Sequence, residues 1–175
     1  MKKIILSTVV IFAVIIACKT NSNSSDTKRL NIRFESKSNS SVSGNASFVE
    51  KNGSVTFVAN LAGLKPGIHA IHIHEKSDCS AADGSSAGGH WNPTFKNHGK
   101  WGAASYHKGD IGNFTANAQG EGTITLTTAE WCIGCGDATK DILGKGLIVH
   151  EGADDFTSQP SGNAGARVAC SAIIK

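Results

Sequence analysis

The chain has 175 residues, a length that predicts one domain large enough to bury a hydrophobic core. With 20 glycines, 3 prolines and few aromatic residues, its composition suits a loop-rich β protein better than a helical one. The 17 basic and 14 acidic side chains give a formal net charge of +3, so we expect no nucleic-acid partner.

Residues 1–17 have the pattern of a secretory signal. Lys2 and Lys3 precede an apolar run over 4–17, whose 14 residues fall short of the ~20 that a membrane-spanning helix needs. The run ends in IIAC and resembles a bacterial lipobox, so we expect cleavage before Cys18 and a lipid anchor on that residue. An ordinary cleaved signal and an uncleaved anchor are the alternatives. This pattern predicts a protein of the bacterial cell envelope that is anchored to a membrane and faces the periplasm or the cell surface.

The residues after the signal divide into a linker and a domain. Residues 18–29 are polar and rich in serine and asparagine, which predicts a flexible linker behind the lipidated cysteine. Removal of residues 1–17 takes away two lysines and no acids, so the formal charge falls to +1. The folded domain is expected over residues 30–175.

The cysteine count agrees with export. Once Cys18 is assigned to lipid, four cysteines remain, an even number that suits an oxidising compartment: Cys79, Cys132, Cys135 and Cys170. From the sequence alone, three pairings of these four residues are open.

Short segments with alternating apolar residues predict a β protein. They run over 30–36, 41–50, 54–61, 70–74, 113–118, 122–128, 146–151 and 168–175, which makes seven or eight strands. Asn52 and Gly53 separate two of them and have the signature of a two-residue hairpin turn. Because no segment shows helical periodicity over a useful length, a sandwich or barrel is expected.

Two stretches, 75–112 and 151–166, lack this alternation and are rich in glycine, asparagine, aspartate and histidine. Loops longer than ~12–15 residues are uncommon unless they carry function. Six of the seven histidines lie in or beside these stretches. We therefore expect the functional site there.

The stretch AIHIH, residues 70–74, places two histidines within one apolar strand. Successive side chains of a strand alternate between its faces, so His72 and His74 share one face while Ile71 and Ile73 share the other. Imidazole is a good ligand for zinc and copper, and Asp110 follows His107 by three residues. The pattern indicates a site for a borderline transition metal.

Six motifs together carry a family resemblance. In chain order they read GIHAIHIHEKSDC, SAGGHWNP, KNHGKW, YHKGDIGN, GLIVHEGADD and GNAGARVAC. In this order and spacing, from about residue 30 to residue 175, they resemble the motif set of the copper–zinc superoxide dismutases. The resemblance implies an all-β fold: an eight-stranded antiparallel Greek-key barrel, flattened into an immunoglobulin-like sandwich, with two long functional loops.

The resemblance also implies a ligand set for two metal ions. His90 matches the histidine that bridges copper and zinc. The positions that match the other copper ligands are His72, His74 and His150. The positions that match the other zinc ligands are His98, His107 and Asp110.

Three further positions match residues around the metals. Asp154 matches an aspartate that orients one copper ligand and one zinc ligand, here His72 and His98. Arg167 matches the active-site arginine, whose permanent charge suits a small anion such as superoxide. His69 recurs in the motif without being a ligand, and strand parity places it away from the metals, so we expect a structural role.

The four domain cysteines divide into an expected pair and an unexpected one. Cys79 and Cys170 occupy the family's disulfide positions. Cys132 and Cys135 form a CxxC motif that the family pattern does not contain, for which we expect a local disulfide, with an extra metal site, thioredoxin-like redox chemistry or free thiols as alternatives. Two smaller departures are Trp91, where phenylalanine is common, and Ser171, where glycine is expected.

The activity implied is conversion of superoxide to O₂ and H₂O₂, with copper alternating between Cu(II) and Cu(I) and zinc as a structural ion. A non-enzymatic copper-binding or copper-delivery lipoprotein with the same fold is the main alternative, and a zinc-stabilised adhesive sandwich is a weaker one. The implied partners are superoxide and a bacterial membrane. The sequence leaves open whether the chain is a monomer or a homodimer.

Overall fold

The computed structural model describes residues 27–175, so the expected signal over 1–17 and the lipidated Cys18 lie outside the described residues. The described part contains eight strands: β1 (Lys28–Ser36), β2 (Ser43–Lys51), β3 (Ser54–Ala62), β4 (Gly67–His74), β5 (Gly112–Ala116), β6 (Gly122–Thr128), β7 (Lys145–His150) and β8 (Arg167–Ile173). A short 3₁₀ helix, η1 (Ser85–Ala87), precedes β5. Over residues 27–175, no helix is both long and apolar enough to cross a membrane.

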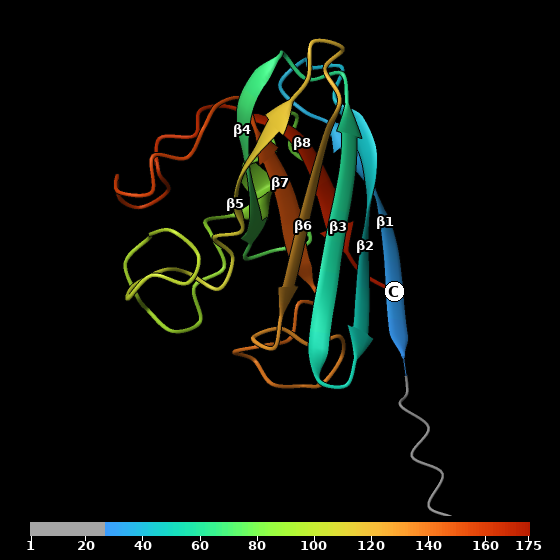
Figure 1. The fold of residues 1–175 in the computed structure, drawn as a ribbon, viewed down its shortest axis with the longest axis vertical. Coiled ribbons are helices and arrows are strands. Elements are labelled where there is room, and N and C mark those ends of the chain that lie inside the picture. Colours follow the sequence, from blue (N-terminus) through green and yellow to red (C-terminus); the bar gives the residue numbers. More distant parts are fainter. Residues whose placement is uncertain (1–26) are drawn as a thin grey trace, which may run out of the picture.

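The strands form one closed antiparallel barrel in the order β1-β2-β3-β6-β5-β4-β7-β8, and β8 pairs back with β1. β3 and β4 are consecutive in the chain but not neighbours in the barrel, because β3 pairs with β6 while β4 pairs with β5 and β7. Figure 1 shows β1, β2, β3 and β6 on the near side of the flattened barrel, with β4, β7 and β8 behind them. The predicted Greek-key barrel is therefore confirmed.

The hairpin between β2 and β3 follows the sequence signal. Lys51 pairs with Ser54, which leaves Asn52 and Gly53 as a two-residue turn. Their φ angles of 52° and 75° are both left-handed, as the turn type favoured in tight hairpins requires. This short turn fixes the register between β2 and β3, which pair along their whole length.

Aromatic side chains fill one end of the barrel core. Phe48 of β2 and Phe57 of β3 are fully buried, with their ring centroids 5.0 Å apart. Trp131, which follows β6, packs on both rings at 6.3 and 6.4 Å. Burial of such large apolar side chains is the main stabilising contribution to the barrel.

The two substitutions noted against the family pattern are accommodated by local contacts. Trp91 is buried, and the ammonium of Lys145 lies 5.6 Å from its ring centroid. Ser171 is also buried and donates a hydrogen bond of 2.8 Å to the carbonyl of Arg33. Neither change leaves its side chain without a partner.

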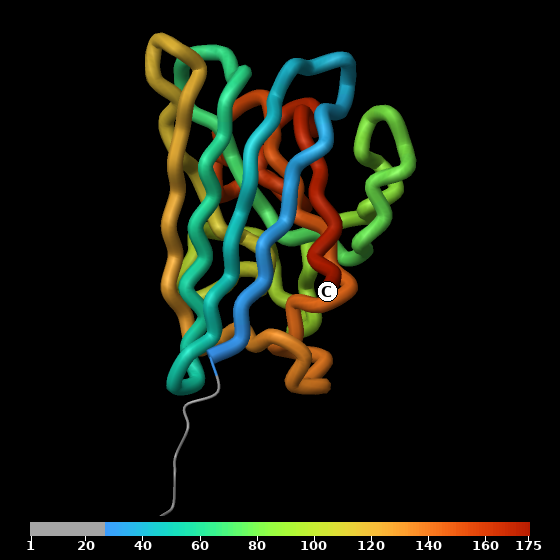
Figure 2. The backbone as a smooth tube through the Cα atoms, turned by 90° about the vertical axis from the view of Figure 1, so that its right-hand side faces the viewer, coloured from blue at the N-terminus to red at the C-terminus, as the bar shows by residue number. Residues whose placement is uncertain are grey.

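The loops gather at two places on the barrel. Figure 1 shows the long loops 75–112 and 151–166 leaving the barrel on the side of β4, β5 and β7. The β6–β7 loop, residues 129–144, covers the end of the barrel where β1 begins, as both views show (Figures 1 and 2). The two functional loops thus cover the outer face of β4, which explains why His72 and His74 are as buried as Ile71 and Ile73 on its inner face.

Candidate metal centre

Four histidines form the first cluster. His72 and His74 come from β4 and His150 ends β7, the neighbouring strand, where a register shift after Val149 changes the direction of the backbone. His90, from the long loop, pairs with His74 through an isolated bridge. One ring nitrogen of each of these histidines lies within 4.8 Å of those of the others, and all four rings are buried.

The second cluster consists of His90, His98, His107 and Asp110, all buried in the loop 75–112. The Asp110 carboxylate lies at its centre, 2.8 Å from His90 Nδ1, 3.0 Å from His98 Nδ1 and 3.2 Å from His107 Nδ1. Asp110 also accepts the backbone N–H of His107 and of Gly99. The donor set of three imidazoles and one carboxylate is typical of a zinc site.

His90 belongs to both clusters. Its Nδ1 faces Asp110 in the second cluster, and its Nε2 has no hydrogen-bond partner. The ring centroid lies 4.1 Å from that of His72 and 5.0 Å from that of His74. The two nitrogens of one ring therefore connect the clusters, as the bridging role requires.

Unpartnered ring nitrogens provide a test of whether metal ions fit here. Buried polar atoms in folded proteins nearly always have a hydrogen-bond partner, because leaving one unpaired costs about 1–3 kcal/mol. Six buried side-chain nitrogens in the described residues lack one, and all belong to the two clusters: His72 Nδ1, His74 Nε2, His90 Nε2, His98 Nδ1, His107 Nδ1 and His150 Nε2. The nitrogens of His98 and His107 are close to Asp110 but are not in hydrogen-bond geometry. Six imidazole nitrogens and one carboxylate fit copper and zinc, for which imidazole is a preferred ligand.

Asp154 fixes one histidine of each cluster. Its Oδ2 accepts a hydrogen bond of 2.9 Å from His72 Nε2, and its Oδ1 accepts one of 2.9 Å from His98 Nε2. The backbone N–H of Phe156, in the same loop, also donates to Asp154 Oδ1 at 2.7 Å. Because each N–H is held by Asp154, the opposite nitrogen of each ring carries the lone pair that a cation needs.

Backbone carbonyls fix two other rings. His74 Nδ1 donates to the carbonyl of Gly88 at 2.9 Å, and His150 Nδ1 to that of Gly165 at 3.3 Å. Sequence reasoning missed both acceptors because a carbonyl can come from any residue. The only available signal was the glycine content of the two loops.

Burial keeps three rings of the first cluster neutral, those of His74, His90 and His150. Desolvation, reinforced by the neighbouring imidazoles, lowers the pKa of His74 well below its usual value, that of His90 to about 4 and that of His150 to about 3. Neutral imidazole is the form that binds a metal ion. These three neutral rings can therefore bind a cation at neutral pH.

The second cluster is more strongly charged. Burial alone would lower the pKa of His98, but the close contacts with the Asp110 and Asp154 carboxylates outweigh it and raise this pKa to about 9, so a cation would replace a proton on this ring. The same contacts with histidines hold the pKa of the Asp110 and Asp154 carboxyl groups well below the usual value, against the effect of burial. Both carboxylates are thus ionised, and the cluster attracts a cation.

A cavity of about 430 Å³ leads from the surface to both clusters. Its lining includes the rings of His74, His90, His107 and His150, together with Arg167. Arg167 donates to the carbonyls of Gly84 at 2.7 Å and Gly88 at 2.8 Å. The arrangement places one permanent positive charge beside the rings of the first cluster.

His69 lies outside both clusters, as expected. It is buried, and its Nδ1 and Nε2 lie 2.9 Å from the carbonyl of His150 and 2.7 Å from that of Lys65. These contacts connect β4 to β7 and to the turn before β4. The ring has a structural position.

Both cysteine pairs form disulfides. Cys79 and Cys170 join the loop after β4 to β8, with a Cα–Cα distance of 5.8 Å. Cys132 and Cys135 form the local disulfide expected for the CxxC motif, with a Cα–Cα distance of 6.0 Å. With their sulfur atoms bonded to each other, these two residues are not free thiols in this structure.

Comparisons with known proteins agree with the geometry. The family model described as copper/zinc superoxide dismutase (SODC) matches residues 42–173. A curated relative, superoxide dismutase [Cu-Zn] 2 of Aquifex aeolicus (strain VF5), is 35% identical over 135 residues, which cover 75% of this chain and 79% of that protein. Among solved structures, the crystal structure of the clock protein EA4 superposes with a TM-score of 0.72 at 32% identity, covering 83% of this chain and 94% of that one.

Proposed function

The chain belongs to the copper/zinc superoxide dismutase family, and from this premise we propose how its own residues carry the activity. The enzyme converts two superoxide anions and two protons to O₂ and H₂O₂. When bound, copper supplies the alternating one-electron exchange between Cu(II) and Cu(I), and zinc supplies a fixed positive charge. The roles of the individual residues are the proposal developed below.

The metal ligands are proposed from the unpartnered nitrogens. Copper is held by His72 Nδ1 and by the Nε2 atoms of His74, His90 and His150. Zinc is held by the Nδ1 atoms of His90, His98 and His107 and by the carboxylate of Asp110. The observation that carries this assignment is that all six unpartnered nitrogens in the described residues belong to these two sets.

Arg167 binds the substrate anion. Its guanidinium lines the cavity beside the rings of His74 and His150 and is oriented by two backbone carbonyls. Because no carboxylate is among its hydrogen-bond acceptors, its charge is available to an anion. A small anion in the cavity is therefore attracted to the part of the site that holds copper.

His90 Nε2 would alternate between two roles, because its single lone pair can bind either copper or one proton of the reaction. This atom has no partner in the protein, while Nδ1 of the same ring is held by Asp110 at 2.8 Å. His90 lines the cavity, so a proton on Nε2 would be within reach of an oxygen species that enters it. The opposite nitrogen, Nδ1, would stay in the zinc set with Asp110, so the ring need not move.

The proposed place of action is the bacterial cell envelope. Support comes from the sequence of residues 1–17, with its apolar run that ends before Cys18, and from two disulfides in the described domain. A lipid on Cys18 would attach the domain to a membrane through the polar linker 18–29. Mass spectrometry of the mature N-terminus, with Cys18→Ser as the comparison, tests this proposal. An unmodified N-terminus downstream of Cys18 contradicts it.

The metal assignment is tested by loading the metal-free protein with copper and zinc. We expect one equivalent of each, a Cu(II) spin-resonance spectrum from nitrogen ligands, and superoxide consumption that requires copper. Protein loaded with zinc alone is the control and should be inactive. Fully loaded protein without superoxide-dependent O₂ release would instead support the copper-delivery alternative, which the intact ligand set and Arg167 do not favour.

A further inference from the structure

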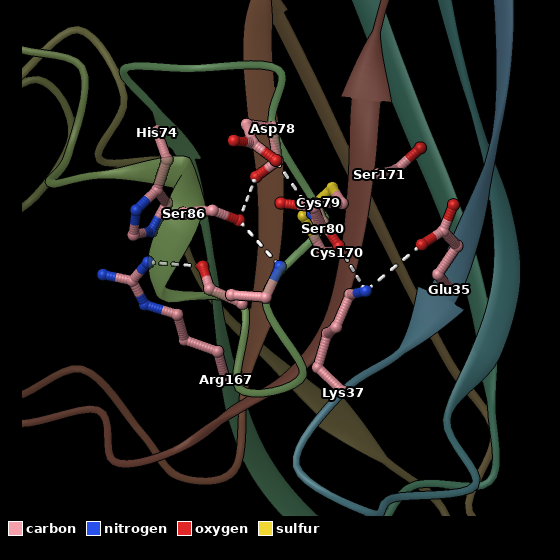
Figure 3. The surroundings of a disulfide bond; sticks show 12 residues. Glu35, Lys37, His74, Asp78, Cys79, Ser80, Ser86, Arg167, Cys170 and Ser171 are labelled. Carbon is pink, nitrogen blue, oxygen red and sulfur yellow. Dashed lines mark hydrogen bonds and ion pairs between the residues drawn. A yellow bond between two sulfur atoms is a disulfide. The ribbon is translucent and has the colours of Figure 1, made fainter.

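The position of Arg167 depends on a loop. Both acceptors of its guanidinium, the carbonyls of Gly84 and Gly88, belong to residues 79–88, which we call the Cys79 loop (Figure 3). This loop is exposed over much of its length and contains only the single turn of η1. Contacts that fix the position of the Cys79 loop therefore also fix the position of the Arg167 guanidinium.

A buried lysine contacts the same loop from the β1–β2 connection. The side chain of Lys37 is 9% exposed, which is unusual for lysine. Its ammonium donates a hydrogen bond of 2.5 Å to the carbonyl of Cys79 and lies 3.2 Å from Glu35 Oε2. In Figure 3, Lys37 lies on one side of the disulfide region and Arg167 on the other. Lys37 is not among the residues that line the metal cavity.

Gly84 lies between the two basic side chains. A Cβ atom built on Gly84 would lie 3.4 Å from Arg167 Cβ and 3.6 Å from Lys37 Cγ. The aliphatic parts of both side chains thus border the same side of this residue, whose carbonyl accepts the bond from Arg167. A displacement of Lys37 changes the surroundings of Gly84 as well as the bond to Cys79.

Backbone hydrogen bonds extend the connection. The N–H of Lys37 donates to the carbonyl of Val168, the residue after Arg167, at 2.9 Å, and the N–H of Ser38 donates to Ala82 at 2.8 Å. The segment around Lys37 therefore touches both the strand that carries Arg167 and the loop that orients its guanidinium. Its side chain adds the bond to Cys79, next to the disulfide with Cys170.

We propose that Lys37 is a positioning residue for Arg167, acting through the Cys79 loop. Its ammonium fixes the carbonyl of Cys79, and its aliphatic chain lies beside Gly84, so that the acceptors of Arg167 stay in place. Loss of these contacts lets the guanidinium sample other positions and weakens the binding of a small anion. The inference rests on the proposed docking role of Arg167.

The test is a double-mutant cycle with azide as the anion probe, on protein with matched copper and zinc content. Lys37→Met retains most of the aliphatic chain but removes the ammonium. We expect it to weaken azide binding, followed by the Cu(II) absorption and spin-resonance spectra, by roughly three- to tenfold. Lys37→Arg, which can still donate to Cys79, should restore binding to within about twofold. In the Arg167→Ala background, Lys37→Met should have no further effect.

Two additional measurements separate positioning from general effects. Lys51→Met removes one positive charge at the exposed β2–β3 hairpin and should leave azide binding unchanged. Hydrogen exchange of metal-free protein should show roughly tenfold faster exchange of the Gly84 and Gly88 amides in Lys37→Met than in wild type. This second readout does not depend on bound metal.

The outcomes distinguish the two proposals. If Arg167→Ala binds azide as wild type does, the docking role is wrong. If Arg167→Ala weakens binding but Lys37→Met does not, the docking role stands and the positioning role is overturned. A loss in Lys37→Met that persists undiminished in the Arg167→Ala background also overturns it, because Lys37 would then act on the anion directly. Should Lys37→Met fail to fold, Lys37→Gln enters the same cycle with the same criteria.

Discussion

Asp154 holds histidines of both clusters through its two oxygens, and Gly162 leaves the space that this contact needs. Gly162 has a φ of +69°, and a Cβ on it would lie 1.8 Å from Asp154 Oδ1 and 2.7 Å from His98 Nε2. Any larger residue must therefore displace the carboxylate or the ring. Glycine at this position is a requirement of the metal site as well as of the loop backbone.

Gly162→Ala should lower zinc and copper affinity by about tenfold or more, the effect typical of disturbing a residue that orients ligands. The matched control is Gly144→Ala, because Gly144 has a φ of +78° and no atom within 4 Å of its Cβ position. Both variants carry the backbone strain of a left-handed alanine, about 1–2 kcal/mol, but only the first should lose metal affinity. Competition with a chelator measures the affinities. Equal losses in the two variants would show that backbone strain, and not the contact with Asp154, is responsible.

Like Asp154, Asp141 orders a loop through its carboxylate. In the β6–β7 loop, this carboxylate accepts backbone hydrogen bonds. Partial burial would raise its pKa, but the N–H groups of Gly136, Leu143 and Gly134 outweigh this and hold the pKa below its ordinary 3.8. A carboxyl group with a depressed pKa in the folded state stabilises the fold above its unfolded-state pKa. This contribution disappears as the pH falls through the folded-state pKa.

Asp141→Asn should therefore be less stable than wild type by about 1 kcal/mol at neutral pH. The difference should be constant above about pH 5 and should shrink below about pH 4, as the wild-type carboxylate becomes protonated. Urea unfolding at several pH values provides the measurement. A difference that is the same at pH 7 and at pH 3 would mean that the charge of Asp141 makes no contribution.

At the scale of elements, the two disulfides act on very different lengths of chain. Cys79 and Cys170 are 91 residues apart and connect the Cys79 loop to β8, whereas Cys132 and Cys135 are only 3 apart within one loop. In the chain-entropy model, the long loop contributes about 4–5 kcal/mol and the short one about 2 kcal/mol. Cys170 is fully buried while Cys135 is exposed.

Replacing Cys132 and Cys135 by alanine should thus cost less stability than the same change at Cys79 and Cys170, by about 2 kcal/mol or more. The long disulfide also positions the Cys79 loop, so only its removal should weaken azide binding. In wild type, a mild dithiol reductant should open Cys132–Cys135 first, because Cys135 is exposed, whereas Cys79 is only partly exposed and Cys170 is fully buried. Mass spectrometry after alkylation identifies the reduced pair. Earlier alkylation of Cys79 and Cys170 would contradict this order.

At the scale of the whole molecule, the metal ligands were easier to predict from the sequence than the groups that orient the side chains of the site. The parity of β4 placed His72 and His74 on one face from the sequence alone, because a strand alternates strictly. The resemblance assigned the other ligands, because their residue types and spacings are specific. Backbone acceptors such as Gly88 could not be predicted, since every residue offers a carbonyl. Lys37 was also missed, because a lysine in a turn is usually exposed and its burial depends on where a loop more than forty residues later folds.

The unpartnered nitrogens also predict what metal removal does to the whole domain. The barrel has its own apolar core, so it should remain folded without metals. The loops 75–112 and 151–166, together with β4 and β7, bring six buried unpartnered nitrogens and the two buried carboxylates of Asp110 and Asp154 into one small volume. Without cations, this concentration of unpaired polar groups opposes closure of the loops. Metal-free protein should therefore have a lower melting temperature. Its faster hydrogen exchange should be confined to these two loops, outside residues 79–88, which the Cys79–Cys170 disulfide ties to β8, while β2, β3 and β6 stay protected. Zinc alone should restore protection mainly around His98 and His107, because these residues belong to the cluster that contains the Asp110 carboxylate. Uniform loss of protection across the barrel would mean that the metals hold the core itself together, contrary to the independence that its buried aromatic residues indicate.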